Sequence, residues 1–294
     1  MAETLIQLQR KKKSAADLSS VVRVMKAMAM SNITQFELAV NSLQEYYRTI
    51  SYGLYACMTT ENISIVNDSN LKGKPSVVVI FGSDQGLVGR FNDSIYLHAQ
   101  NTLKELPGEI EVWAIGERIY ALLMDEGIEP TKYFNIPNSV EAITPLVNQI
   151  LIESEKIGQG IQDYNLFIFH NQPTEDANYK QQNSRLFPPD SDWEKSILEI
   201  QWPNQSVPQV IGQAEDTMRV LIREYLFVSL YKACAESLAA ENASRLDAME
   251  RAEKNIEEVV DELDLSYNRL RQSMIDGELF DLIAGFEALK KDDN

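Results

Sequence analysis

The sequence predicts an α/β protein in which a central parallel α/β domain is inserted between two long terminal helices. The first observation is the placement of helix-breaking residues. All ten prolines fall between Pro75 and Pro208, and glycine is almost absent before residue 72 and after Gly212. Because proline breaks a helix interior and glycine weakens it, both outer stretches are expected to be helical. We therefore assign 1–60 to an N-terminal coiled-coil helix, 70–208 to a globular domain and 213–290 to a C-terminal coiled-coil helix.

The second observation is an apolar repeat that both outer stretches share. Its steps alternate between three and four residues, a mean of about 3.5, which is typical of a left-handed coiled coil. Because a long insert separates the two stretches, antiparallel pairing with each other is the simplest way to bury both. The first stripe comprises Leu18, Val22, Met25, Ala29, Phe36, Val40, Leu43, Tyr47, Ile50, Leu54 and Cys57, and the second comprises Ile256, Val260, Leu263, Tyr267, Leu270 and Met274.

The predicted length of the last helix indicates a mechanical role. At roughly 1.5 Å per residue, a helix over 213–289 would be on the order of 110 Å long. That length exceeds what an enzyme core needs and suits a shaft. Acidic pairs along it, Glu257-Glu258 and Asp261-Glu262, occupy outward positions of the repeat, so we interpret them as a solvated face rather than a cation site.

The middle of the chain alternates short apolar runs with helical patterns. Residues 76–82 and 166–169 are expected to be buried strands, with a further strand over 111–116. Helices are predicted over 92–106, 117–126 and 139–156. Such alternation builds a Rossmann-like parallel sheet. The chain from His170 to Pro208 is less regular, and Ile197–Trp202 is predicted to be a final edge strand.

Composition excludes several classes of protein. The chain has 294 residues, 44% of them hydrophobic, and a net charge of −17. The sequence contains no run of eighteen apolar residues, the length needed to span a membrane. The basic cluster Arg10–Lys13 is not followed by the apolar segment of a secretory signal. Two cysteines, Cys57 and Cys234, are too few for a disulfide scaffold, and we expect both to be small side chains packed against their neighbours. The acidic surface disfavours nucleic acid as a partner.

No active site can be assembled from the sequence. The turn Gly82–Gly89 follows a strand, where phosphate loops lie, but its glycines match neither common phosphate-binding pattern, so we interpret it as a structural turn. The two histidines, His98 and His170, are far apart and lack partners at catalytic or metal-binding spacing. We therefore expect no catalytic residue, no cofactor and no metal.

Three motifs, in order along the chain, resemble the gamma subunit of F-type ATP synthases. The most specific is Ser237–Met249, S-L-A-A-E-N-A-S-R-L-D-A-M, followed by Tyr267–Ile275, Y-N-R-L-R-Q-S-M-I. The family reads S-L-A-S-E-N-A-A-R-M-x-A-M and Y-N-R-A-R-Q-A-x-I-T there. Met25–Met30 and Ser83–Asn92 are similar to the family's K-A-M and T-D-R-G-L-C-G-G-x-N segments. The resemblance covers essentially the whole chain.

The resemblance implies a rotor subunit that performs no catalysis itself. In that family the two terminal helices form a coiled coil inside a ring of three alpha and three beta subunits, and the α/β domain meets epsilon and the membrane c-ring. Rotation of the shaft couples ion flow to conformational cycling of the catalytic beta subunits, in ATP synthesis or hydrolysis. The chain would then be peripheral, on the cytoplasmic face of a bacterial plasma membrane, or on a thylakoid membrane if cyanobacterial.

The resemblance also implies which residues meet the ring. Arg271 and Gln272 match the positions that catch loops of beta, and Met28 matches the methionine beside the lever region of beta. The apolar end of the last helix, including Leu279, Ile283 and Phe286, would meet the sleeve of the ring.

Several positions depart from the family pattern. Gln85 replaces the usual arginine, Arg90 replaces a glycine, and Asp276 replaces the threonine after the catch. These departures indicate a divergent bacterial-type member, and a subunit of an alternative or Na⁺-coupled ATPase is one alternative. Two other classes stay open from the residues alone. They are a nucleotide-binding α/β protein with helical flanks and a free coiled-coil scaffold.

Overall fold

Each terminal stretch forms one continuous helix in the computed structural model. The structure describes residues 4–61, 74–106, 108–157, 164–174, 179–206 and 208–292. Helix α1 covers Leu5–Glu61 and helix α6 covers Ala214–Asp292, which confirms the prediction of long helices without proline. No helix in these described ranges contains a stretch long and apolar enough to cross a membrane.

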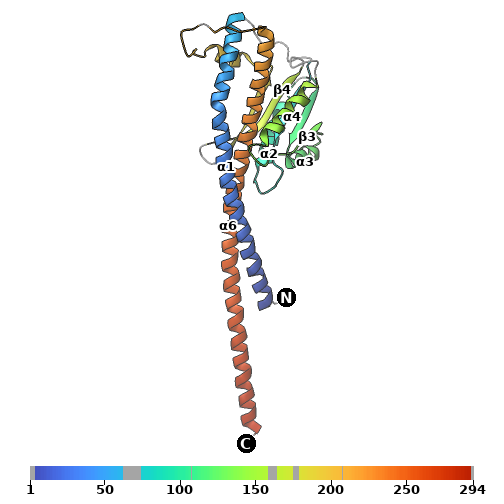
Figure 1. Cartoon of the computed structure of the whole chain (residues 1–294). Coiled ribbons are helices and arrows are strands. Elements are labelled where there is room, and N and C mark those ends of the chain that lie inside the picture. Colours follow the sequence, from blue (N-terminus) through green and yellow to red (C-terminus); the bar gives the residue numbers. More distant parts are fainter. Residues whose placement is uncertain are drawn as a thin grey trace. The chain divides into compact units, whose positions relative to one another are not determined.

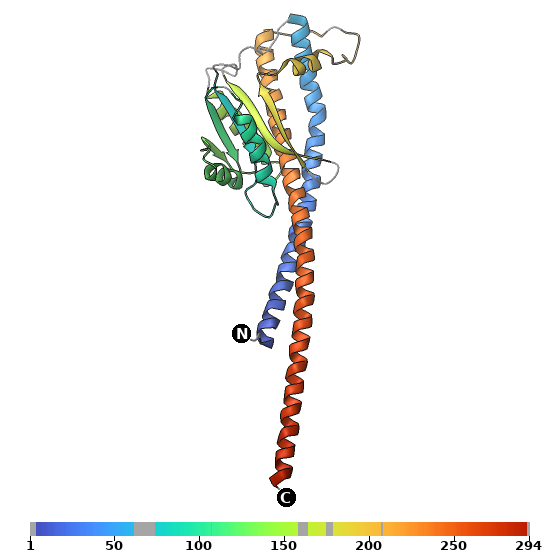
Figure 2. The same ribbon diagram turned by 180° about the vertical axis from the view of Figure 1, so that it is seen from behind.

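The chain divides into two compact units, and α1 and α6 contribute to both. The α/β unit is Ala29–Arg245, and the terminal unit combines Met1–Met28 with Leu246–Asn294. In each unit a segment of α1 lies beside a segment of α6 (Figures 1 and 2). The two segments run in opposite directions, as the sequence predicts for the two ends of the chain.

A five-stranded sheet forms the centre of the α/β unit. Its strands are β1 (Ser76–Phe81), β2 (Ile110–Ile115), β3 (Lys132–Phe134), β4 (Asn165–Pro173) and β5 (Tyr179–Phe187), in the order β3-β2-β1-β4-β5. The first four are parallel, and Val79 of β1 lies between Trp113 and Ile168 in register. Strand β5 pairs antiparallel with β4, so the sheet is mixed rather than wholly parallel as predicted.

Helices cover both faces of the sheet, which explains the continuous apolar runs of its central strands. Alternate β1 side chains, such as Ile80, pack with α2 (Phe91–Leu103) and α3 (Glu117–Asp125). The other side chains, such as Val79, join a larger core with α4 (Ile143–Glu155), α5 (Ser191–Leu198) and the α1 and α6 segments. Every residue of β1 is buried. Figure 1 shows α2, α3 and α4 against the sheet.

The predicted edge strand over Ile197–Trp202 is wrong. Residues 191–198 form α5, and the Asp190 carboxylate caps this helix by accepting the backbone N–H of Trp193 at 2.8 Å. Asp is a preferred N-cap residue, so the signal for a helix start was present in the sequence. The true edge strand is β5, whose polar run through residues 180–185 lacks the apolar alternation that predicts strands.

The apolar repeat is buried along much of its length but not at its ends. In the α/β unit, Phe36, Ile50, Leu54 and Cys57 are all at most 4% exposed. Leu18 and Met274, by contrast, are about half exposed in the terminal unit. The repeat therefore predicts the buried face well where the sheet adds a third layer, and less well where two helices pack alone. The acidic pairs at 257–258 and 261–262 face solvent as predicted.

Replacing Leu54 with alanine tests the packing of α1 on the core. This side chain is fully buried, so Leu54→Ala should lower the free energy of unfolding by about 2–5 kcal/mol through lost transfer energy and a new cavity. Urea denaturation of the full chain, followed by circular dichroism, measures the change.

The matched control is Leu38→Ala on the same helix, where the side chain is 63% exposed. We expect a change within about 0.5 kcal/mol there. Equal losses from the two variants would contradict the assigned buried face of α1.

Candidate functional site

A short polar segment of α6 is buried within the α/β unit. In Glu236–Arg245, which we call the anchor segment, Glu236, Ser237, Glu241 and Asn242 are each at most 8% exposed. Burying polar groups costs free energy unless they are hydrogen-bonded, so each needs a partner. Asn242 finds a partner on α1, Glu236 on β4 and Glu241 on α6 itself, while the Ser237 hydroxyl has no hydrogen-bond partner among the described residues.

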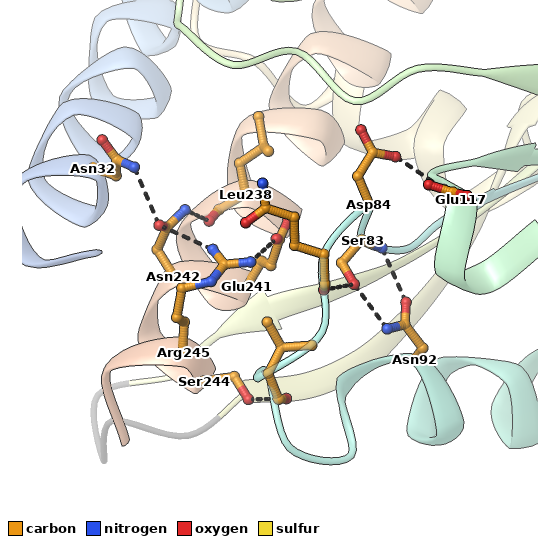
Figure 3. Close-up of polar contacts among 12 residues, drawn as sticks. Asn32, Ser83, Asp84, Asn92, Glu117, Leu238, Glu241, Asn242, Ser244 and Arg245 are labelled. Atoms are coloured by element: carbon orange, nitrogen blue, oxygen red, sulfur yellow. Dashed lines mark hydrogen bonds and ion pairs between the residues drawn. The ribbon is translucent and has the colours of Figure 1, made fainter. Parts of the chain in front are cut away.

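The contact with α1 is an amide pair. Asn32 donates from Nδ2 to Oδ1 of Asn242 at 3.3 Å, and Asn242 donates from its own Nδ2 to the Leu238 carbonyl at 2.8 Å (Figure 3). A side-chain amide can donate and accept at once, so Asn242 joins the two helices and satisfies itself on its own helix. This pair of amides fixes the register of α1 against α6 at Asn32 and Asn242.

An ion pair lies one turn along the same face. Arg245 Nη2 lies 2.5 Å from Glu241 Oε1, and both side chains are largely buried. Burial raises the pKa of the Glu241 carboxyl, and the charge and hydrogen bond of Arg245 oppose that rise. Arg245 also donates to Oδ1 of Asn242 at 3.4 Å, so the ion pair and the amide pair form one network (Figure 3).

The loop after β1 docks on the anchor segment. Ser244 donates its hydroxyl to the Val88 carbonyl at 2.6 Å, and Ala240 is fully buried against Val88 and Phe91. Leu87 and Gly89 both have positive φ, 62° and 57°, which turns the chain sharply around Val88. Strands are added outward from β1 first through β2 and β3 and then on its other side through β4, and α/β sheets commonly bind ligands at such a reversal of strand order. In this protein the loop beside that point contacts α6.

The polar groups of this loop make hydrogen bonds within the α/β unit. Ser83 donates its backbone N–H to Asn92 Oδ1 at 3.0 Å, and Asn92 donates back to the Ser83 hydroxyl at 2.8 Å (Figure 3). Asp84 accepts the backbone N–H of Glu117 at 2.9 Å, at the start of α3. A side chain on Gly82 would come within 2.4 Å of Ile119. These contacts support the interpretation of Gly82–Gly89 as a structural turn.

The third contact joins the anchor segment to β4. His170 Nε2 lies 2.9 Å from Glu236 Oε2, and Gln172 donates to Oε1 of the same carboxylate at 3.2 Å. Burial alone would raise the pKa of Glu236, but His170, Lys232 and Gln172 together hold it below its ordinary value. Glu236 is therefore a carboxylate that the surrounding donors stabilise.

The terminal unit is held by a narrow apolar seam and by ion pairs. Val22 of α1 packs with Met249 and Ile256 of α6. Beside this seam, Arg23 lies 3.0 Å and Lys26 3.3 Å from Glu253. These hydrogen bonds lower the pKa of Glu253. Lys12 and Asp264 form a further ion pair at 2.5 Å, which continues the antiparallel register toward the start of α1.

The contact residues that the resemblance implies all lie in the terminal unit. By the register of the ion pairs, Arg271 is level with the first residues of α1, and both Arg271 and Gln272 are exposed. Neither makes a hydrogen bond or ion pair with another described residue. Met28 is 62% exposed, and Leu279 and Ile283 are about half exposed. Phe286 lies within α6, but its side chain is outside the described ones.

Sequence reasoning missed most of the anchor network. Asn32 carries no signal in a long helical pattern, and His170 and Glu236 are too far apart in sequence for any spacing to connect them. The sequence predicts Asn92 only as the first residue of a helix, whereas in the structure its side chain also holds Ser83. The available signal was Glu241 and Asn242 themselves, two polar residues in an otherwise small and apolar helical run. Among the described residues, no group of three or more His, Cys, Asp or Glu could hold a metal ion.

Comparison with known proteins agrees with this architecture of paired terminal helices around an α/β insert. The family model described as ATP synthase matches residues 4–289. A curated ATP synthase gamma chain of Clostridium botulinum (strain Okra / Type B1) is 28% identical over 298 residues, covering 97% of this chain and 98% of the relative. A gamma chain of Clostridium acetobutylicum is 24% identical over 291 residues, with the same coverage.

Solved structures share the fold. A chain in the Euglena gracilis mitochondrial ATP synthase, OSCP/F1/c-ring, superimposes with a TM-score of 0.65 at 15% identity, covering 97% of this chain and 94% of the other. A chain in the central stalk/c-ring structure of the Tetrahymena thermophila mitochondrial ATP synthase gives 0.54 at 18% identity, covering 79% and 99%. The fold is thus that of ATP synthase central stalks. The chain belongs to the gamma family of ATP synthases and is a central stalk subunit of an F-type enzyme.

The buried ion pair can be tested against an exposed one on the same helix. Glu241→Met removes the carboxylate and leaves the Arg245 guanidinium buried without its partner. We expect a loss of about 3–5 kcal/mol in the free energy of unfolding, measured by urea denaturation. The double variant Glu241→Met, Arg245→Met should lose less than the single one, because no charge is left uncompensated.

The control is Asp247→Ala, which breaks the exposed pair of Arg251 and Asp247 at the same spacing. Exposed pairs of this kind contribute less than about 0.5 kcal/mol. A double variant as unstable as Glu241→Met would show that Arg245 does not depend on Glu241.

Proposed function

We propose that this central stalk subunit is the rotor shaft that couples ion flow through a membrane sector to conformational cycling of catalytic beta subunits. The observation that carries the proposal is the continuous helix α6, in a chain that matches the family over residues 4–289. The helix pairs with α1 through Val22, Met249 and Ile256 and then continues beyond the start of α1 (Figures 1 and 2). A helix without proline resists bending, which torque transmission requires.

We propose that the terminal helices and the central domain have different roles. Residues 1–60 and 213–290 would form the shaft, and residues 70–208 would form the domain near the membrane sector. We propose a ring of three alpha and three beta subunits, the epsilon subunit and the c-ring as partners. The neighbouring solved structures contain F1 and c-ring components, which supports this set. The net charge of −17 makes nucleic acid a poor partner.

We propose that the subunit is itself not an enzyme and needs no cofactor. In support, the polar groups of the Gly82–Gly89 turn already bond to Asn92, Gln85 and Glu117. The nucleotide-binding alternative would need those groups for phosphate. The proposed location is peripheral, on the cytoplasmic face of a bacterial plasma membrane, or on a thylakoid membrane in a cyanobacterium.

Ring contacts are proposed at exposed positions of the terminal unit. Met28, Arg271 and Gln272 would meet loops of beta, and Leu279, Ile283 and Phe286 would meet the sleeve. The exposure of the five residues whose side chains are described supports the proposal, because such groups are available to a partner. Bonds that form in only one rotary state shift the relative free energies of the states, which a rotary catalyst requires.

The double variant Arg271→Ala, Gln272→Ala tests the catch. Each lost hydrogen bond to beta should be worth roughly 0.5–3 kcal/mol, with the charged donor at the upper end. We expect the complex to assemble, since neither side chain packs in the chain's own core. Steady-state ATP turnover and ATP-driven ion pumping should fall together, measured on the purified complex in vesicles.

Arg251→Ala is the control, because it removes an exposed arginine of the same helix that pairs only with Asp247 among the described residues. Its turnover should match that of the parent complex. Turnover of the double variant equal to that of the control would mean that Arg271 and Gln272 are merely solvated.

A further inference from the structure

A half-open cavity of about 510 Å³ lies inside the α/β unit, where α1 and α6 meet the β4–β5 ribbon. Its α1 wall contains Leu43 and Tyr47, and its α6 wall contains Tyr225 and Val228. Alternate residues of β4, from Ile168 to Gln172, and residues of β5 between Gln182 and Leu186 form the remaining wall. A volume of this size is typical of sites for small organic molecules. Glu236 of the anchor segment lines the cavity together with its partners His170 and Gln172, whereas none of the proposed ring-contact residues lines it.

The lining of the cavity includes both aliphatic and polar side chains. Val40, Leu43, Val228 and Leu186 supply aliphatic surface. The polar lining residues include Lys232, Arg185, His170 and Glu236. Such a mixed lining suits a ligand that has an apolar body and one polar end.

The charged lining residues favour an anion. Glu236 is the only carboxylate among the lining residues, and His170 and Gln172 already donate to its two oxygens. Lys232 is held only loosely, 3.8 Å from Glu236, and its side chain is 55% exposed. Lys232 can therefore turn toward a ligand without leaving Glu236 unpaired. Lys232 is therefore the cation best placed to meet an anionic ligand.

A buried polar atom without a partner lies in the same wall. Nδ1 of His170 makes no hydrogen bond in the described part of the chain, although the residue is only 4% exposed. Buried polar side-chain atoms are normally satisfied, so an orphan beside a cavity indicates a missing group. In a ring that donates only from Nε2, Nδ1 is an acceptor, so a ligand hydroxyl or a water molecule bound beside the ligand could supply its partner.

We propose that this cavity binds a small amphipathic carboxylate, with its apolar body against α1 and α6 and its carboxylate at Lys232. The proposal is independent of the rotor function, since it concerns only the interior of the α/β unit.

Phenylbutyrate is the probe, added to the purified full chain and followed by isothermal titration calorimetry. It should bind saturably at one site. Butyrate lacks the aromatic body and phenylbutylammonium reverses the charge, so both should bind at least about tenfold more weakly. Lys232→Gln should weaken phenylbutyrate binding about tenfold, the loss of one charge-assisted hydrogen bond.

Two further variants keep the result interpretable. Arg219→Gln removes an exposed cation of α6 that pairs with Asp216 and lies outside the cavity, so affinity should not change. Ser229→Phe fills the cavity from α6 and should abolish binding while the circular dichroism spectrum stays unchanged. Binding of phenylbutylammonium as tight as that of phenylbutyrate, equal losses from Lys232→Gln and Arg219→Gln, or no saturable binding would each overturn the proposal.

Discussion

The buried polar anchor segment of α6, Glu236–Arg245, is the constraint on which the α/β unit depends. One stretch of helix meets three different elements, through Asn32 of α1, Val88 of the loop after β1, and His170 of β4. Apolar packing alone is non-directional and would allow the sheet to slide along a uniform helix. Hydrogen bonds have defined geometry, and a slip of one turn would leave several buried polar groups unpaired at a cost of about 1–3 kcal/mol each. The anchor segment therefore fixes the position of the sheet along α6.

This constraint has a direct mechanical consequence for a rotor. A domain that passes torque to a helix must not rotate or slide on it. Asn32 joins α1 to Asn242, and Val88 joins the loop after β1 to Ser244, so both elements are attached to one turn of α6 beside the Glu241–Arg245 pair. The terminal unit uses a different principle. There the seam of Val22, Met249 and Ile256 is narrow, and partly exposed ion pairs of Arg23 and Lys26 with Glu253 flank it. Exposed side chains remain available for partners in that unit.

The sequence predicts the long helices and the central parallel strands well because both follow from strong local signals. Proline is absent from α1 and α6, and β1 reads as an unbroken apolar run because helices cover both of its faces. The errors occur where local signals are weak. Strand β5 is polar because it is an edge strand, and the helix start at Asp190 was overlooked in favour of a strand at Ile197. The anchor network could be anticipated only at Glu241 and Asn242, since its partners Asn32 and His170 are placed by tertiary packing rather than by spacing.

The most direct test of the central claim is to observe rotation of this chain. Cys57 and Cys234 are buried, so Lys104→Cys on the exposed surface of the α/β unit adds the single exposed thiol to which a fluorescent label can attach. The labelled chain is assembled with its alpha and beta subunits, the ring is fixed to a surface, and the orientation of the label is recorded by single-molecule polarisation during ATP hydrolysis. The account predicts stepwise rotation in one direction that stops when ATP is removed. A stationary label in complexes that continue to hydrolyse ATP would contradict it.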